Sequence, residues 1–494
     1  MKLLSKIFSL FLVLILALGM FVGCNTSGNE DISDDDYEDD SDEGVDYFPE
    51  VDKQDYSDEF NMYIASEAER NYYVLDESNG SPMDEAVYYR MERVKRYLGL
   101  DMVLYAPSGY NWQNYAQVVG NSITNKDGTM DALIPMNYAQ VTILVTEGYL
   151  TDWFDVDGID LDAEYWNLDA MEELELKGHC FFAIGDCIIL NTYLVAFNKD
   201  MYDMYKDNPN FGGKTFYDLV LDYEWTWEKM MEISSIVEYD RTGDGKTLDD
   251  TYGFSSNGWE YSTSIIQSCE IKILEMDESG KYKLSINNEV NYPKTQRMVE
   301  LLSEWYKSNS VYVAFKDKDW ASEPVVAITT GRTLMSFGGT SELESWLDYD
   351  LDFGVLPYPM YDTNQKAYHS LQHSGLLALP IYMTDPLMSA ECMEMFCFYS
   401  DPVKITFYEK MLGKQVSDAP EDAEMLELIW DSLCLDIGET FCQIESGRVP
   451  MLYTFSLTTD PDPSTGSETN LASLIAQRES IVNKGIQDLM ASLK

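Results

Sequence analysis

Apolar residues recur with helical spacing in the first folded part of the chain, and residues 84–98 are predicted to form a helix that stops before Gly99. Four apolar side chains fall on one face of this helix: Val87, Met91, Val94 and Leu98. Residues 100–105 then alternate like a strand, 131–135 form a second short apolar strand, and 138–146 have a helical pattern. This alternation of helices and strands predicts βαβ units and a parallel sheet. Ligands bind beyond the carboxyl ends of the strands in such sheets.

The pattern continues into a second α/β region and then into a helical third of the chain. Strands are predicted over 190–197, 331–339 and 353–359, and Thr226 is positioned to cap a helix that runs to residue 237. Four further helices are predicted at 390–399, 404–411, 423–434 and 471–494.

The first 24 residues have the pattern of a secretory signal. Lys2 and Lys6 precede an apolar run over 7–18, and Val22 and Gly23 precede Cys24. This ending resembles a bacterial lipobox, which implies that Cys24 is lipidated and becomes the first residue of the mature chain. The protein would then be anchored to the membrane by acyl chains on its extracytoplasmic face. The alternative is an ordinary signal peptide with an incidental cysteine.

Residues 25–59 are expected to form an acidic, disordered tether. Between Glu30 and Glu59 there are 16 Asp and Glu residues and one Lys, with too few apolar residues to build a core. Repulsion between like charges extends such a segment. It either holds a folded domain away from the membrane or acts only as a solvated tail.

Charge and length constrain the remaining function classes. The whole chain has a formal net charge of −54, which disfavours a nucleic-acid partner. The portion after the tether is long enough for two domains. No zinc-protease HExxH, GxSxG nucleophile elbow, phosphate-binding GxxxxGK[ST] or GxGxxG motif occurs, which narrows the enzyme classes that remain. A carboxylate pair for glycoside hydrolysis stays an alternative among 87 acidic residues.

Seven cysteines follow Cys24, and their spacing matches neither a zinc site nor a CxxC redox motif. Pairs close in sequence, 180 with 187 and 434 with 442, are candidates for disulfides. Buried free thiols are the equal alternative.

Motifs spread from about residue 60 to about 440 resemble the family 1 extracellular solute-binding proteins, the receptors of ABC importers for sugars. In chain order they are DEAVYYR (84–90), DALI (131–134) with EGYL (147–150), GD (185–186), FNKD (197–200), EWTW (224–227), GRTLM (331–335) and FGVLPYP (353–359). The resemblance implies an α/β, two-lobed periplasmic-binding-protein-like fold of type II, with a hinge that the chain crosses more than once.

The implied lobes are 60–188 plus 369–412, and 189–368 plus 413–494. The implied function is to capture a sugar or oligosaccharide in the cleft between the lobes and deliver it to ABC permease subunits, as a monomer without a required cofactor. The resemblance therefore implies a binding protein and not an enzyme. A lipid-anchored glycosidase and a sensing or adhesion module without transport are the alternatives.

Aromatic residues make up 13% of the chain, and aromatic rings suit the apolar faces of sugars. The arrangement of lobes and crossings in this family implies eight ligand-binding candidates: Tyr138, Asp186, Tyr193, Trp259, Phe337, Glu342, Trp346 and His369. His373 falls at the same crossing as His369. The alternative for any aromatic residue among them is a place in the core.

Residues 240–246 match the first half of an EF-hand-type calcium loop. The candidate ligands are Asp240, Thr242, Asp244, Lys246 through its carbonyl, and Asp250. Position 12 of the loop is Thr251 instead of the usual Glu, so an acidic turn without metal is the alternative.

Overall fold

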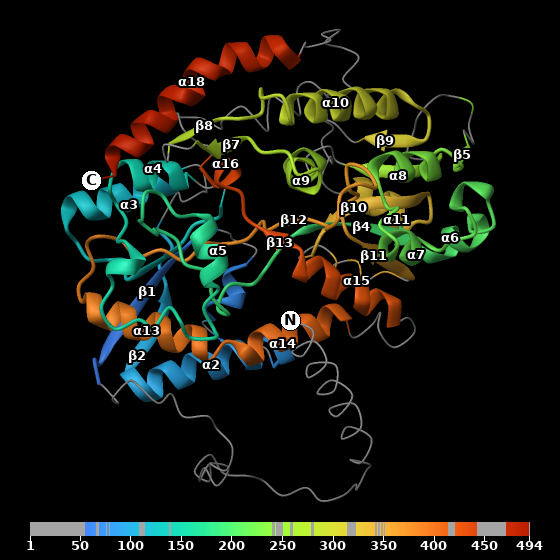
Figure 1. Cartoon of the computed structure of the whole chain (residues 1–494). Coiled ribbons are helices and arrows are strands. Elements are labelled where there is room, and N and C mark those ends of the chain that lie inside the picture. Colours follow the sequence, from blue (N-terminus) through green and yellow to red (C-terminus); the bar gives the residue numbers. More distant parts are fainter. Residues whose placement is uncertain are drawn as a thin grey trace, which may run out of the picture. The chain divides into compact units, whose positions relative to one another are not determined.

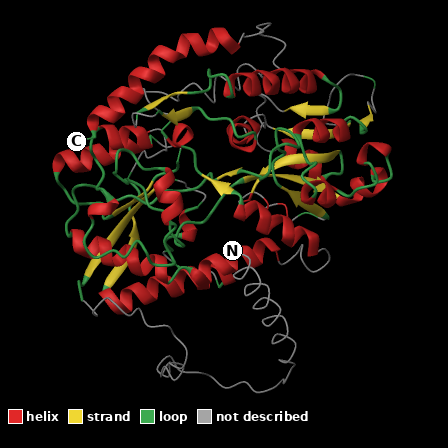
Figure 2. Cartoon of the chain, viewed as in Figure 1, coloured by secondary structure: helices red, strands yellow, loops and turns green. Residues whose placement is uncertain are grey.

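The computed structural model describes most of the chain after residue 54. The described residues are 55–65, 69–75, 77–78, 80–107, 114–137, 140–239, 243, 250–256, 260–277, 281–313, 323–340, 343, 346, 349, 351–412, 420–441 and 471–493. Strands gather in two separate main sheets, each with helices packed around it (Figures 1 and 2). We call the two regions the first and the second lobe.

The first lobe contains three parallel strands in the order β2-β1-β3. β1 (Asp58–Ile64) lies between β2 (Leu100–Leu104) and β3 (Ala132–Ile134). The sequence pattern missed β1, because its first residues are acidic and continue the charged segment before it. Its helices are α2 (Pro82–Leu98), α3 (Tyr115–Asn125), α4 (Val141–Thr146), α5 (Leu168–Glu173) and α13 (Pro386–Phe398), with short 3-10 helices η2 (Arg70–Tyr72) and η4 (Trp153–Asp155).

The predicted helix over 84–98 is α2, which begins two residues earlier. The Ser81 hydroxyl accepts a hydrogen bond from the Asp84 amide at 3.1 Å, and Pro82 occupies the first turn, where its missing N–H costs nothing. Gly99 ends the helix with φ +66°, a left-handed conformation that favours glycine.

The second lobe contains a six-stranded mixed sheet in the order β11-β4-β10-β6-β5, with β9 also paired to β6. The strands are β4 (Tyr193–Asn198), β5 (Glu238–Tyr239), β6 (Thr251–Ser256), β9 (Val311–Val313), β10 (Thr333–Gly339) and β11 (Phe353–Leu356). Its helices are α6 (Lys199–Tyr205), η5 (Pro209–Phe211), α7 (Phe216–Leu221), α8 (Trp227–Ser234), α9 (Glu260–Ser268), α10 (Asn291–Lys307) and α11 (Glu323–Thr329). As predicted, the Thr226 hydroxyl caps α8 by accepting a hydrogen bond from the Lys229 amide.

Two hydrophobic cores lie in the described part of the chain, one within the first lobe and one centred on the second lobe that also takes in Met83, Ala86 and Val87 of α2. The core of the first lobe surrounds Tyr63, Leu133 and Phe182. The core of the second lobe is strongly aromatic: the Phe337 ring stacks on Tyr358 with centroids 4.7 Å apart. Much of the aromatic content of the chain is therefore used for packing.

Paired segments join the lobes. Thr192 pairs with Gln372, and β12 (Ser370–Leu371) lies beside β13 (Leu433–Cys434), while the pairing of Ala183 with Leu377 lies within the first lobe. The remaining elements are the hairpin of β7 (Leu274–Met276) and β8 (Tyr282–Leu284), and helices α14 (Asp401–Leu412), α15 (Pro420–Asp431), α16 (Ile437–Thr440) and α18 (Leu471–Ser492). The predicted α/β fold with a hinge crossed more than once is confirmed.

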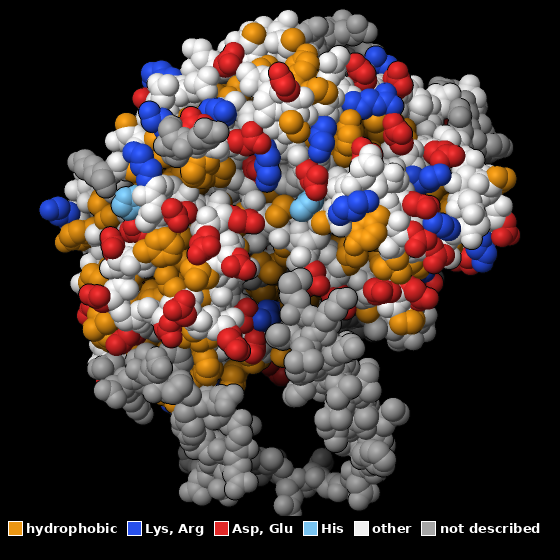
Figure 3. Space-filling view, viewed as in Figure 1, with side chains coloured by type: hydrophobic (Ala, Val, Ile, Leu, Met, Phe, Trp, Pro, Cys, Tyr) orange, Lys and Arg blue, Asp and Glu red, His pale blue; other side chains and the backbone are white. Residues whose placement is uncertain are grey.

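Acidic and basic side chains are interspersed on the face of the molecule that Figure 3 shows. None of the helices in the described part of the chain combines the length and the apolar character that a membrane span requires.

Candidate functional site

The carboxyl ends of strands from both lobes meet the same two crossing segments. β3 of the first lobe leads into Asn137, whose amide nitrogen Nδ2 donates to the Gln372 carbonyl at 3.0 Å. β10 of the second lobe leads into Thr340, whose amide donates to the Thr192 carbonyl at 2.9 Å. Since ligands of α/β sheets bind beyond the carboxyl ends of strands, this meeting point is the candidate site.

A set of buried neutral side chains joins these segments, and we call it the hinge network: Asn137, Asn191, Thr192, Thr340, Gln372 and Ser374. The Thr340 hydroxyl donates to Asn191 Oδ1 at 2.6 Å and accepts from the Thr192 amide at 3.1 Å. Gln372 Nε2 donates to the Ser374 hydroxyl at 2.8 Å. The network therefore ties both sheets to both crossings without using a charge.

Tyr193 and His373 lie beside the hinge network. The two rings are 5.0 Å apart, and the His373 amide donates to the Asn191 carbonyl at 2.7 Å. Burial lowers the pKa of His373 to about 4, so its ring stays neutral at physiological pH. Tyr193, a predicted ligand residue, is placed by β4 at the junction of the crossings and is 9% exposed.

A second set, the charged cluster, consists of the buried Glu69 and Arg90 and the half-buried Asp186 and Lys404. The Arg90 guanidinium is completely buried and donates to the carbonyls of Tyr72 and Tyr73, the latter at 3.0 Å. Burial raises the pKa of Glu69 to about 8. Asp186, another predicted ligand residue, forms an ion pair with Lys404 at 2.6 Å. Burial raises the pKa of the Asp186 carboxyl, against the opposing effect of Lys404.

Phe337 and Trp346, also predicted to touch ligand, lie in the core of the second lobe. Phe337 is 2% exposed, and its ring packs against Phe254 and Tyr358. Trp346 is fully buried, with its ring edge-on to Phe353.

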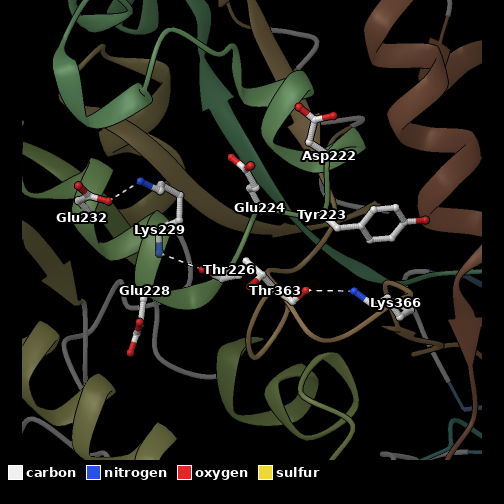
Figure 4. Close-up of a pocket in the computed structure, with 9 residues that line it drawn as sticks. All are labelled: Asp222, Tyr223, Glu224, Thr226, Glu228, Lys229, Glu232, Thr363 and Lys366. Carbon is white, nitrogen blue, oxygen red and sulfur yellow. Dashed lines mark hydrogen bonds and ion pairs between the residues drawn. The ribbon is translucent and has the colours of Figure 1, made fainter.

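His369 lies at the rim of a cavity of about 680 Å³ that elements of both lobes line. Its Nε2 is 3.3 Å from Glu270 Oε1. Glu173 of the first lobe, Lys272 of the second, and Asp436 after β13 also line this cavity. A second cavity of about 580 Å³ lies within the second lobe. Figure 4 shows its carboxylates and the Lys229 side chain, which is bound to Glu232.

Several sequence-based predictions lie outside the described residues: Tyr138, Trp259, Glu342, the lipidation site Cys24, and the calcium-loop residues Asp240, Thr242, Asp244 and Lys246. Asp250 is described and 2% exposed. Within the described ranges, no group of three His, Cys, Asp or Glu side chains could hold a metal ion. The ligand-binding roles and the calcium loop stay predictions.

Sequence reasoning missed most of the hinge network. The rule that ligands bind beyond the carboxyl ends of strands points to Asn137, just after β3, but no motif in the sequence singles out Asn191, Thr192, Thr340 or Gln372. A signal was present: Asn191 and Thr192 are polar residues that directly follow the apolar run 188–190. Their partners are 148 or more residues away along the chain, so no local pattern could pair them.

Two comparisons match this chain to known proteins. Residues 106–390 match the model of a family described as bacterial extracellular solute-binding protein. Among curated protein sequences, none matches this chain.

Solved structures with a similar fold include an ABC substrate-binding protein from Listeria monocytogenes in complex with cycloalternan. It has 13% identity and a TM-score of 0.56 over 87% of this chain and 99% of that chain. The maltose/maltodextrin-binding domain MalE from Bdellovibrio bacteriovorus, bound to maltotriose, has 14% identity and a TM-score of 0.54. The match covers 87% of this chain and 100% of that chain. A solute-binding protein from Thermotoga lettingae bound with α-D-tagatose has 12% identity and a TM-score of 0.54. The match covers 87% of this chain and 100% of that chain. At such identities the likeness shows the fold alone.

Proposed function

Because this chain belongs to the family of bacterial extracellular solute-binding proteins, we propose that it captures a carbohydrate between its lobes and delivers it to an ABC importer. The observation that carries the proposal is the meeting of β3 and β10 at the hinge network. A ligand that contacts the ends of both sheets favours the arrangement in which the lobes approach each other. Members of this family are binding proteins, and no catalytic step is proposed.

Three observations support carbohydrate as the ligand class. The similar folds named above hold cycloalternan, maltotriose and tagatose. The hinge network offers amide and hydroxyl groups, which suit the hydroxyls of a neutral sugar. The formal net charge of −54 disfavours an anionic ligand.

Calorimetric titration with cyclic and linear oligosaccharides and with monosaccharides tests the proposal. At least one of these sugars should bind. Tyr193→Ala should then weaken its binding at least tenfold, while Tyr88→Ala, on an exposed part of α2, should leave the affinity unchanged. A folded protein that binds no carbohydrate contradicts the proposal.

Delivery and anchoring need separate measurements. Loss of sugar uptake after deletion of the gene supports delivery to an importer, whereas unchanged uptake contradicts it. We propose further that Cys24 carries the lipid anchor. Cys24→Ser should then release the protein from the membrane fraction and abolish labelling by a radioactive fatty acid.

A further inference from the structure

Two buried cysteine sulfurs, far apart in the sequence, lie in contact. The Sγ atoms of Cys187 and Cys397 are 2.9 Å apart, although 210 positions separate the two residues. Both side chains are completely buried. Two unbonded sulfur atoms rarely approach so closely, and a disulfide needs a separation of about 2.05 Å. A small shift of either side chain would close this distance.

The backbone is built to bring these residues together. Gly185 lies directly against α13: a Cβ atom there would be 2.9 Å from Cys397 Sγ and 2.8 Å from the Tyr165 carbonyl. The Asp186 amide donates to that same carbonyl at 2.8 Å, and the Ile188 amide donates to the Gly185 carbonyl at 2.9 Å. These bonds fix the turn that carries Cys187, so the contact follows from close packing around a glycine.

The other described cysteines have different surroundings. Cys180 Sγ is 3.3 Å from the Phe182 carbonyl, and Cys269 Sγ is 3.8 Å from the Ser268 hydroxyl. Cys392 is fully buried on the same helix as Cys397. Among the six described cysteines, the contact between two sulfurs is confined to the Cys187 and Cys397 pair. The pairing of 180 with 187, which the sequence suggested, is absent, because Cys187 faces α13 instead.

We propose that Cys187 and Cys397 form a disulfide bond in the mature extracellular protein. Extracellular proteins meet oxidising conditions in which disulfides persist. The oxidant is a disulfide, either a small molecule or a thiol oxidoreductase. Each cysteine gives up its proton, the two sulfurs together give up two electrons and form the S–S bond, and the oxidant is reduced to two thiols.

The bond closes during folding, before the pair is sealed from solvent. Burial and the neighbouring Cys187 raise the pKa of the Cys397 thiol well above its ordinary value, so the reactive thiolate is disfavoured once the lobe has formed. The bond then holds the start of the first crossing, at Ile188, against the end of α13. It stabilises the fold mainly by constraining a very long loop of the unfolded chain.

Mass spectrometry of the full-length protein tests the proposal directly. The protein is recovered from its extracellular location without reductant, denatured in the presence of an alkylating agent and digested. We expect a cross-linked peptide pair that joins Cys187 to Cys397, while Cys392, the matched buried control, is alkylated. Alkylation of both Cys187 and Cys397 throughout the sample overturns the proposal.

Thermal melting gives a second measurement that depends on the bond. Wild-type protein refolded with reductant should melt several degrees below the oxidised protein, and Cys392→Ala should retain this difference. The double variant Cys187→Ala/Cys397→Ala should melt at the same temperature with and without reductant. A double variant whose melting still depends on reductant contradicts the assignment to this pair.

Discussion

The hinge network and the charged cluster both bring polar groups together near the lobe crossings, but they differ in charge and in burial. In the hinge network, neutral amides and hydroxyls bond to one another and to main-chain groups, and nearby His373 stays uncharged down to a pH of about 4 because burial lowers its pKa. In the charged cluster, Arg90 depends on carbonyl partners and Glu69 has a pKa of about 8. The comparison indicates that the hinge network keeps the same charge as pH changes around neutrality. The charged cluster, in contrast, makes the free energy of unfolding depend on pH in that range.

Glu69→Gln should have the largest effect. The folded protein keeps this carboxyl protonated up to pH 8, whereas the unfolded chain releases the proton above 4.5. The unfolded state binds fewer protons between these values, so stability falls as pH rises, by ~5 kcal/mol in total. Urea unfolding at pH 5 and pH 8.5 should show most of this loss in the wild type and little in the variant. The same loss in both proteins would contradict the role of Glu69. The exposed Glu92→Gln is the control.

Arg90→Ala should lower the free energy of unfolding by ~4 kcal/mol, because the buried carbonyls of Tyr72 and Tyr73 lose a charged donor. The ring of Phe396, 3.9 Å from the guanidinium carbon, also loses its contact. Lys95→Ala on the same helix breaks only an exposed ion pair, which solvent screens, and should leave the free energy of unfolding nearly unchanged. Urea unfolding measures the free energy of unfolding of both variants. Equal losses would contradict the claim that the buried Arg90 charge matters more than the exposed Lys95 charge.

His373→Gln should remove part of the dependence of stability on pH below neutrality. The folded pKa of about 4 lies below the ordinary value of 6.5, so the unfolded state binds more protons between these values. Stability of the wild type therefore falls as pH drops through this window, by ~3 kcal/mol from this residue, and the variant should lack that contribution. His369→Gln, at the partly exposed second histidine, is the control. A variant that keeps the wild-type acid slope would show that His373 does not carry it.

Thr340→Val should cost ~2 kcal/mol, because the Thr192 amide and Asn191 Oδ1 both lose their partner in a buried site. If the hinge network forms the floor of the ligand site, sugar affinity should fall as well. Thr330→Val removes a hydroxyl that bonds only to carbonyls of its own exposed turn, and its effect on thermal unfolding should be small. Equal stability of Thr340→Val and the wild type would contradict the bonding described for the network.

Lys404→Met should have the smallest effect, ~1 kcal/mol or less, because the Lys404 and Asp186 side chains are 32% and 28% exposed. The clearer result should be a further rise in the pKa of the Asp186 carboxyl, since its cationic partner is gone. NMR titration of that carboxyl group measures this rise. An unchanged titration would mean that the ion pair does not form in solution.

The sequence predicted elements with strong local signals and missed contacts between distant residues. α2 was predicted to within two residues because its apolar spacing and its closing glycine are local features. β1, at the centre of its sheet, was missed because its acidic first residues hide a strand. The ion pair of Asp186 with Lys404, 218 positions later, had no local signal, and the ligand-binding role of Asp186 stays a prediction. A carboxylate's partner depends on which helix packs over it, and that is decided by the tertiary fold.

α18 contacts the cores of both lobes. Leu471, Ile475, Val482 and Ile486 pack into the second core, whereas Leu489 and Leu493 pack into the first. With 22 residues it is a rod of about 33 Å. A rotation of one lobe against the other would have to bend this rod or slide its last turns, so the helix would act as a strut against such a motion. Trimming the chain before Leu489 would release one end of this strut.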